Sequence, residues 1–338
     1  MEKTKLYGDY NLDTLLLRER LRVKENFDVI EKHLTVCGMD TCFFYIDGFV
    51  KVGEMLRIMQ YILSLKELGS AEELEKRMPY VEVDTESDVG KIILAVLSGQ
   101  TAFLSESFGT RAMLLDLRTY PARPTQEPEA DRVMQGARDG FVETLTVNTT
   151  LIRRRIRDER LTMEHFSLGA SSETDVVMCY MQGIAKDKTV LDIRKKLKSI
   201  RPKSLTLGYQ SLAESLIRTG WYNPFPKIRT TERPDAAAAQ LLEGSVIVIC
   251  DTSPQAMILP TSIFDYLEET DDFYFPPLTG TYLRFVRTAI LLLSVVITPL
   301  WYLSLEYIDR LPEMLAFLVP DNPGSLPIIL QLFLVELA

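Results

Sequence analysis

The sequence has few of the residues on which enzymes and metal sites usually depend. Its two histidines, His33 and His165, are far apart, and its cysteines form no CxxC pair. It also lacks a GxxxxGK phosphate loop and a GxGxxG turn after a strand. No His–carboxylate–nucleophile set can be assembled from these spacings, so we predict no catalytic site, no metal and no cofactor.

An excess of basic charge is also missing. The 338 residues carry a net charge of −9, which argues against nucleic acid as a partner because phosphates require a basic surface. Residues 1–11 lack the apolar core of a signal peptide, so we expect this end to remain in the cytoplasm. We therefore expect reduced thiols at Cys37, Cys42, Cys179 and Cys250.

Carboxylates are plentiful, and two clusters of them allow two interpretations. Neighbouring carboxylates can bind a cation or carry out acid–base chemistry. The alternative, which we favour, is a solvent-exposed helix cap followed by a solvent-exposed loop, with Asp84 as the cap. The clusters are Asp84, Glu86 and Asp88, and Glu268, Glu269, Asp271 and Asp272.

One long apolar run stands near the C-terminus. Thr288 to Leu305 contains no charged residue, and as a helix it would cover roughly 27 Å, close to the thickness of a bilayer core. Arg284 and Arg287 precede it, which places its N-terminal end in the cytoplasm. Pro299 would kink the helix, a break that membrane bundles and pore walls tolerate. The run thus predicts a transmembrane helix in a lipid bilayer.

A second apolar run, Pro327 to Ala338, is too short to cross a bilayer. We expect it to begin a further membrane segment, and we expect the sequence to be a fragment with a truncated membrane domain.

Residues 36–270 resemble two copies of one unit. Asp40, Tyr45 and Gly48 match Asp175, Tyr180 and Gly183 in strand–glycine–helix segments. Each copy later has a helix that ends at a glycine, Gly99 or Gly244, followed by two strands. Alternating helices and apolar strands predict an α/β class with mixed sheets.

The predicted organisation follows from this duplication and from the proline-rich stretch after Tyr120. Residues 11–34 are expected to form a charged amphipathic helix. The divisions are an N-terminal helical segment (1–35), a first α/β subdomain (36–120), a linker (121–139), a second α/β subdomain (140–275), a transmembrane helix (284–306) and the start of a further membrane segment (326–338).

A basic run, Leu151 to Arg160, contains apolar residues at helical spacing. It predicts either a solvent-exposed helix face or an interface helix that pairs with acidic residues on a neighbour or with lipid headgroups.

Two motifs carry a family resemblance. Glu127 to Ile156 resembles a signature with a GPREGF-like turn followed by NxxLIRRR, and Glu232 to Pro260 is similar to ERPD…LxEGRV…DGTP…P. This sequence departs from the pattern at four places: Ala137 for proline, Asp139 for glutamate, Ser245 for arginine and Thr252-Ser253 for Gly-Thr. The family that these motifs resemble is the spore-germination receptor A subunit of the GerA type. Asp272 to Arg287 is more similar to the branch that contains stage V sporulation protein AF.

The resemblance implies a membrane subunit and not an enzyme. Such subunits have a cytosolic domain of two α/β subdomains and a helical membrane domain, and they reside in the inner spore membrane. They are thought to form homo-oligomers around an ion-conducting pore and to act with other receptor subunits. The alternative is a membrane-tethered ligand sensor or scaffold without conduction.

The resemblance also selects candidate structural and interface residues. They are Asp139, Gly140, Phe141, Glu143, Asn148, Arg153, Arg154, Arg155, Glu232, Asp235, Glu243, Gly244, Asp251 and Pro254, with Arg284, Arg287 and Pro299 in the membrane part.

Overall fold

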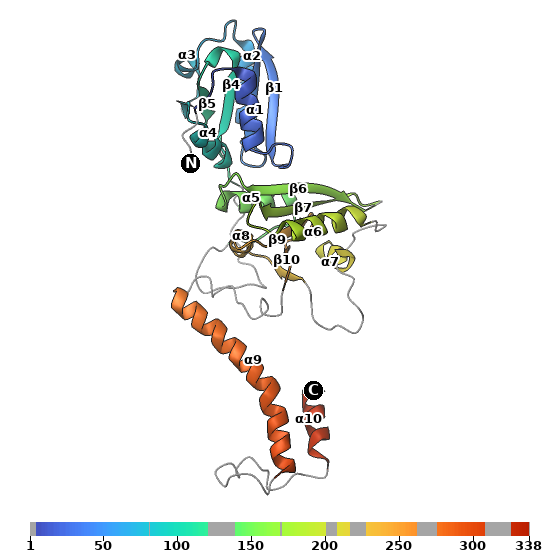
Figure 1. Cartoon of the computed structure of the whole chain (residues 1–338). Helices are drawn as coiled ribbons and strands as arrows, with labels where there is room; N and C mark the ends of the chain where they lie inside the picture. Colours follow the sequence, from blue (N-terminus) through green and yellow to red (C-terminus); the bar gives the residue numbers. More distant parts are fainter. Residues whose placement is uncertain are drawn as a thin grey trace. The chain divides into compact units, whose positions relative to one another are not determined.

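The computed structural model describes residues 5–80, 82–120, 139–169, 171–200, 208–216, 228–261, 276–307 and 326–337. The chain divides into two compact units, Met1–Ser262 and Ile263–Ala338. The first unit contains two α/β lobes, residues 5–120 and 139–261, and the second contains two apolar helices (Figure 1).

The first lobe is built on a five-stranded sheet of order β1-β2-β4-β5-β3, in which every neighbouring pair is antiparallel. Its elements are α1 (Tyr10–Arg20), β1 (Val29–Val36), β2 (Met39–Ile46), α2 (Val52–Ser64), α3 (Ala71–Arg77), β3 (Val83–Glu86), α4 (Val89–Leu97), β4 (Thr101–Ser105), the 3-10 helix η1 (Glu106–Phe108) and β5 (Ala112–Leu115).

The second lobe repeats this plan, with the order β6-β7-β9-β10-β8 and antiparallel neighbours throughout. Its elements are α5 (Leu145–Arg155), β6 (Leu161–Leu168), β7 (Thr174–Met181), α6 (Asp187–Ser199), α7 (Tyr209–Leu216), β8 (Arg229–Thr231), α8 (Pro234–Leu242), β9 (Val246–Cys250) and β10 (Ala256–Leu259). Asp40 and Asp175 are both the second residue of their strands, and Tyr45 and Tyr180 both the penultimate one. The predicted duplication is confirmed.

Each lobe has three layers because the central strands bury both faces. In β2, Cys42 and Phe44 point into a core shared with α1 and α4, whereas Phe43 points into the opposite core, shared with α2 and α3. In the second lobe, α5 and α8 cover one face and α6 and α7 the other. Strands buried on both faces read as continuous apolar runs, which is why β4 and β9 were recognisable in the sequence.

The helix ends follow local chemistry. Gly99 and Gly244 lie just after α4 and α8 with φ of 99° and 96°, so the predicted glycine caps are confirmed. The predicted N-cap at Asp84 was wrong: Asp84 lies in β3, and Asp88 caps α4 by accepting a hydrogen bond from the Lys91 backbone N–H. The cluster at Glu268 to Asp272 lies outside the described residues.

The expected helix over residues 11–34 was wrong in its second half. The helix α1 ends at Arg20, and Val29–Val36 forms β1 at the edge of the first sheet. An edge strand tolerates charged side chains, so β1 lacks the clean apolar alternation that marks a strand. Leu17 and Leu21 are buried in the core of the first lobe. The repeat therefore starts at α1, and residues 10–36 belong to the first lobe rather than to a separate segment.

The expected mixed sheets are antiparallel throughout the described residues. The helix α4 links β3 to β4, which run in the same direction, but β5 lies between them. A helical crossover in the sequence therefore does not make its two strands neighbours. The predicted linker (121–139) lies, except for Asp139, outside the described residues.

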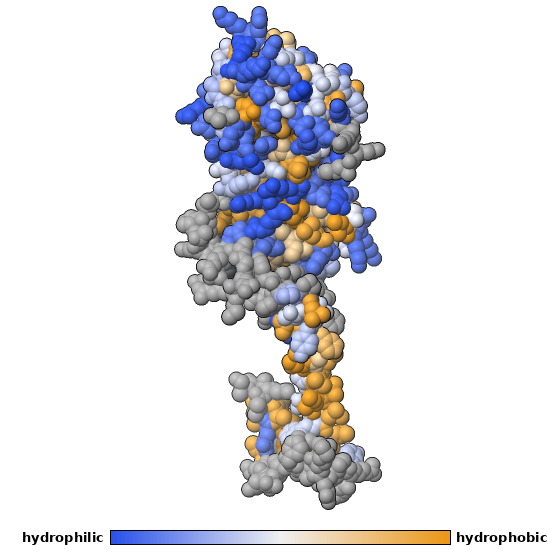
Figure 2. Space-filling view, turned by 90° about the vertical axis from the view of Figure 1, so that its left-hand side faces the viewer, coloured by the Kyte–Doolittle hydropathy of each residue, from blue (hydrophilic) through white to orange (hydrophobic). Residues whose placement is uncertain are grey.

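In the second unit, α9 (Pro277–Glu306) contains a stretch, Leu278–Leu305, that is long and apolar enough to cross a membrane. It begins seven residues before the predicted start at Arg284, ends where predicted and contains Pro299. Figure 2 shows its apolar surface in orange, in contrast to the mainly hydrophilic surface that the lobes present in that view. The final apolar run forms α10 (Ile328–Leu337).

The four cysteines are free thiols. Cys42, Cys179 and Cys250 are buried in strands, and burial raises the pKa of Cys250 to about 12 and that of Cys179 further above its usual range. Cys179 and Cys250 therefore behave as small apolar core residues, as expected.

The assignment of α1 to the first lobe can be tested within that helix. Leu17 is fully buried, whereas Leu15 is 46% exposed. We expect Leu17→Ala to lower the free energy of unfolding by about 2–5 kcal/mol, because it leaves a cavity in the core. Leu15→Ala should cost less than about 1 kcal/mol. Thermal and urea unfolding followed by circular dichroism would measure both, and equal effects would contradict the assignment.

Candidate functional site

The helix α5 joins the two lobes. Leu151 and Ile152 are buried in the core of the second lobe. On another side of the helix, Thr150 and Thr146 lie against Gly48, which follows β2 of the first lobe with φ of 81°. A Cβ on Gly48 would come within 2.5 Å of Thr150 Cγ2. The lobes thus pack closely at this point, and we call the contacts of α5 with the first lobe the junction.

Arg153 is the centre of the junction. Its side chain is fully buried, and its Nε and Nη2 donate to the two carboxylate oxygens of Asp28 at 2.9 and 3.0 Å. Nη1 donates to the Leu161 carbonyl at 3.2 Å, and Nη2 also reaches Asn26 Oδ1 at 3.4 Å. A guanidinium suits this place because its fixed fork of donors matches a carboxylate.

Because the Arg153–Asp28 ion pair is buried, separating the two lobes would be costly. A charge removed from water costs several kcal/mol unless its partner and further hydrogen bonds replace the lost hydration. Asp28 comes from the first lobe and Arg153 from the second, so separating the lobes would leave each without its partner. We therefore infer that the pair favours this docked arrangement over others.

The loop between α1 and β1 covers the edge strand β6 of the second sheet. The Phe27 N–H donates to the Met163 carbonyl at 3.1 Å, and the Met163 N–H donates to Asn26 Oδ1 at 2.8 Å. Arg22 donates to Thr162 Oγ1 at 2.8 Å. An uncovered edge strand would expose unpaired backbone groups that invite further pairing. The first lobe therefore satisfies backbone groups of the second.

The two other arginines of the run also have partners. The Arg154 guanidinium lies 4.3 Å from the centre of the Tyr120 ring at the end of the first lobe, a cation–π contact. Arg155 Nη2 contacts Asp139 at 2.6 Å. In this run, Arg153 and Arg154 thus contact the first lobe, whereas Arg155 pairs within the second lobe. The pairing with acidic residues on a neighbour or with lipid headgroups stays a prediction.

The two sequence motifs meet in the second lobe. The Phe141 N–H donates to the Glu232 carbonyl, and the Thr252 N–H donates to the Glu143 carbonyl, both at 2.8 Å. The Leu145 N–H donates to Asp251 Oδ1 at 3.0 Å. The segment that leads into α5 is therefore held by the start of α8 and by the turn after β9.

Inside the first motif, the side chain of Asn148 closes a local loop. It accepts from the Val142 N–H at 2.7 Å and donates to the Val142 carbonyl at 2.6 Å. Asn148 is fully buried, and Gly140 and Phe141 of the same motif are also buried. These residues shape the entry to α5.

The second motif starts and ends α8. Pro234 is the first helical residue, where its missing N–H costs nothing, and Asp235 pairs with the buried Arg233 at 2.6 Å. Glu243 is the exposed C-cap, and a Cβ on Gly244 would lie 3.1 Å from the Ile184 carbonyl oxygen. Pro254 lies half-buried in the turn before β10.

One departure from the family pattern has a structural consequence. Thr252 stands where the pattern has glycine, and its φ is 62°. Left-handed backbone is costly for a β-branched residue and free for glycine. In this chain the turn therefore has a strained backbone at Thr252. The hydrogen bond from the Thr252 N–H to the Glu143 carbonyl stabilises this conformation.

Several junction residues had no signal in the sequence. Asp28 and Asn26 lie in a charged stretch that gives no indication of burial, yet both are only 2% exposed. Gly48 was identified only as the glycine that matches Gly183 in the repeat. Arg284, Arg287 and Pro299 all lie in α9, in the other unit. Within the described residues, the polar junction groups named here pair with one another across the two lobes.

The buried pair predicts a large asymmetry between two arginines. Arg153→Met leaves Asp28 buried without its partner and should lower the free energy of unfolding by about 3–5 kcal/mol. Arg160→Met removes an exposed pair with Asp158, which solvent screens, and should leave the urea midpoint close to that of the wild-type chain. Urea unfolding of both variants measures the difference. Similar midpoints for the two variants would show that the buried pair contributes little.

The close approach at Gly48 can be tested against its counterpart. Gly48→Ala and Gly183→Ala both place a side chain at positive φ, 81° and 76°, which costs about 1–2 kcal/mol. Around Gly183 no atom lies within 4 Å of the added Cβ, whereas at Gly48 the added methyl overlaps Thr150. We expect Gly48→Ala to cost a further 1–3 kcal/mol or so by overpacking. Thermal unfolding that ranks the two variants equally would argue against the close lobe contact.

Comparison with known proteins connects this architecture to a family. The family described as "Bacillus/Clostridium GerA spore germination protein" matches residues 17–338. Stage V sporulation protein AF of Bacillus subtilis is 34% identical over 99% of this chain and 69% of its own length. Spore germination protein A1 of Bacillus subtilis is 24% identical over 97% of this chain and 67% of its own length.

A solved structure has the same fold. The crystal structure of the N-terminal domain of the A subunit of the Bacillus megaterium spore germinant receptor GerK3 aligns with a TM-score of 0.60 and 24% identity. It covers 78% of this chain and 99% of that domain. The Bacillus subtilis protein named as an uncharacterized membrane protein, YfkQ, is 28% identical over 89% of this chain and 60% of its own length. In this chain, α9 is long and apolar enough to cross a membrane. The chain belongs to the Bacillus/Clostridium GerA spore germination protein family, with a role in spore germination and association with a membrane.

Proposed function

We propose that this protein is a membrane subunit of a spore germination complex, in which several copies form an ion-conducting assembly that releases ions during germination. The observation that carries the proposal is the combination of family membership with α9, an apolar helix that contains Pro299. Two relatives carry names of germinant-receptor type, spore germination proteins A1 and B1. We therefore expect other receptor-type subunits as partners.

The orientation in the proposal follows from charge. Arg284 and Arg287 lie in α9 before its uncharged stretch, and positive residues remain on the cytoplasmic side of a membrane helix. The two lobes precede these arginines in the chain. The proposal therefore places the lobes in the cytoplasm and α9 in the inner spore membrane.

Pro299 supports a helix that packs against others. Its ring removes one backbone donor from α9 and leaves the carbonyl of Val295 without its usual helical partner. In a bilayer, freed carbonyls are tolerated where neighbouring helices or a water-filled cavity satisfy them. Such a position suits a bundle or a pore wall.

The proposal assigns no catalysis to the lobes. His165 on β6 is paired with Asp175 on the adjacent strand β7 at 2.9 Å, and its ring centre lies 5.8 Å from that of Phe27. No nucleophile approaches His165 in the hydrogen bonds of the described residues. In the proposal, the junction holds the two lobes as one body, so that a signal received by one lobe reaches the other.

The test is ion release from liposomes. The protein is reconstituted alone and together with its receptor-type partners in liposomes loaded with potassium and calcium, and release is followed with ion-selective electrodes. We expect release that is lost in a variant without residues 277–338. Pro299→Leu should change the release rate while insertion, measured by flotation, is retained.

Two results would oppose the proposal. Equal release from the variant without residues 277–338 would assign the leak to the preparation. Absence of release in every combination of subunits would favour a scaffold or a tethered sensor without conduction.

A further inference from the structure

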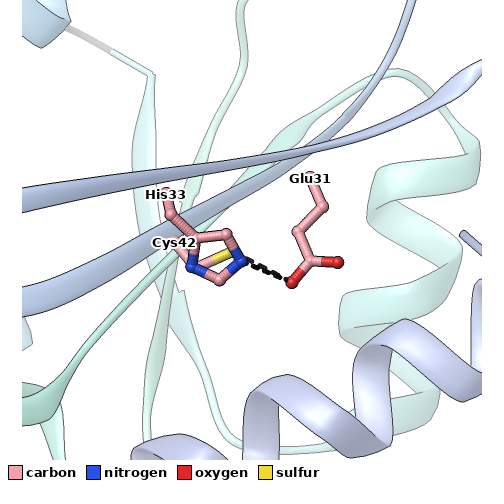
Figure 3. A group of neighbouring side chains, drawn as sticks. All are labelled: Glu31, His33 and Cys42. Carbon is pink, nitrogen blue, oxygen red and sulfur yellow. Dashed lines mark hydrogen bonds and ion pairs between the residues drawn. The ribbon is translucent and has the colours of Figure 1, made fainter.

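Three side chains on the first hairpin bring metal-binding atoms to one point. Glu31 and His33 lie two residues apart on β1, so they share a face of the sheet, and Cys42 is the direct cross-strand partner of His33 on β2. The atoms Glu31 Oε1, His33 Nε2 and Cys42 Sγ all lie within 4.8 Å of one another (Figure 3). No other such group occurs in the part of the chain that the structure describes.

The separations are close to those of a tetrahedral site. Oε1 and Nε2 are 2.8 Å apart, and Sγ is 3.9 Å from Oε1 and 4.0 Å from Nε2. Bonds of about 2.0 Å to nitrogen or oxygen and about 2.3 Å to sulfur, at tetrahedral angles, place ligand atoms roughly 3.3–3.6 Å apart. The three atoms surround such a position after shifts of about half an ångström.

The same geometry argues against a Cys–His–Glu catalytic triad. In a triad, the orienting carboxylate and the nucleophile occupy opposite ring nitrogens. Here both Glu31 and Cys42 approach Nε2. Cys42 is fully buried, and burial followed by the charge of Glu31 raises the pKa of its thiol far above the usual range. Such a thiol is a poor nucleophile but becomes a thiolate when a metal replaces its proton.

Two side chains of α1 contact the proposed metal ligands Glu31 and His33. Arg18 Nε donates to Glu31 Oε2 at 2.8 Å and Nη2 donates to Oε1 at 2.5 Å, and Tyr10 Oη lies 3.4 Å from His33 Nδ1. Ligands of bound metals are usually oriented by such hydrogen bonds, and Arg18 can stay on Oε2 while Oε1 turns to a cation. Both outer residues come from α1, so a bound ion would tie this helix to the hairpin.

Of the three side chains, His33 lines a groove of about 690 Å³ between α1 and the hairpin. Tyr10, Arg18 and Thr14 also line this groove. Thr14 is 4% exposed, and its Oγ1 has no hydrogen-bond partner among the described residues. The groove thus leaves room for a fourth ligand, such as water, beside the half-exposed His33.

The second lobe provides an internal comparison. By strand register, Met163, His165 and Val177 occupy the places of Glu31, His33 and Cys42. Two of the three have no metal-binding atom of comparable strength, and the backbone of Met163 is bonded to the first-lobe residues Asn26 and Phe27. The duplicated fold therefore does not by itself require a Glu–His–Cys set at this position.

We propose that Glu31, His33 and Cys42 form a binding site for a divalent transition metal of the zinc type, with the fourth position open to the groove. Mixed thiolate, imidazole and carboxylate ligands suit Zn²⁺, whereas Mg²⁺ and Ca²⁺ prefer oxygen ligands alone.

The test uses the purified 338-residue chain in detergent, dialysed against zinc and then against metal-free buffer. We expect one zinc ion per chain by elemental analysis, and cobalt substitution should give a sulfur-to-metal charge-transfer band. His33→Ala and Cys42→Ser should lose the ion and the band. The matched controls His165→Ala and Cys37→Ser should retain both. Zinc, but not magnesium, should raise the melting temperature of the wild-type chain.

Cys42 is a core residue, so Cys42→Ser could lose zinc by unfolding. The decisive variant is therefore His33→Ala, because the His33 side chain is half-exposed. Circular dichroism checks that this variant is folded. Arg18→Gln should weaken zinc affinity by about 10–100-fold if Arg18 orients the ligand. Zinc that is retained equally by His33→Ala would overturn the proposal, because binding would then be at other surface groups. Loss of zinc from the wild-type chain on dialysis would also overturn it and leave Glu31 as the ion-pair partner of Arg18 alone.

Discussion

The buried ion pair between Arg153 and Asp28 is the interaction on which the arrangement of the two lobes depends. Its two members come from different copies of the repeat, and neither is exposed to water. A buried charge is tolerable only with its partner and its full set of hydrogen bonds, so we infer that the pair disfavours other ways of docking the lobes. The apolar contacts around the pair bury surface between the lobes, and the pair fixes the position of one lobe against the other.

The duplication explains how one fold produced two different uses of the same helix. The helices α1 and α5 are of equal length, and Arg18 and Arg153 hold the same position when counted from their first residues. Arg18 pairs with Glu31 of its own lobe, whereas Arg153 reaches Asp28 of the other lobe. The outer face of α1 borders a groove, while the corresponding region of α5 is covered by the first lobe.

The family motifs acquire a physical meaning in this structure. The residues of the first motif shape and hold α5, and those of the second begin α8 and form the turn that receives the segment before α5. They are therefore the parts that place Arg153 at the junction. Several charges of these motifs are used for orientation within the fold, because Arg153 pairs with Asp28, Arg155 with Asp139 and Asp235 with Arg233.

Local sequence determined those features that depend on neighbours in the chain. The apolar runs of β4 and β9, the glycines after α4 and α8, the duplication and the length of α9 were all predictable, because burial on both faces, positive φ and membrane thickness act on short segments. Tertiary structure decided the rest. The sequence of β1 carries the charges of an edge strand, so it resembled a helix. The strand β5 lies between β3 and β4, although α4 connects those two strands in the sequence. Asp28 meets Arg153 across 125 residues, and Cys42 meets His33 only through the hairpin register. Contacts between distant residues depend on how whole elements pack, and no local pattern records that packing.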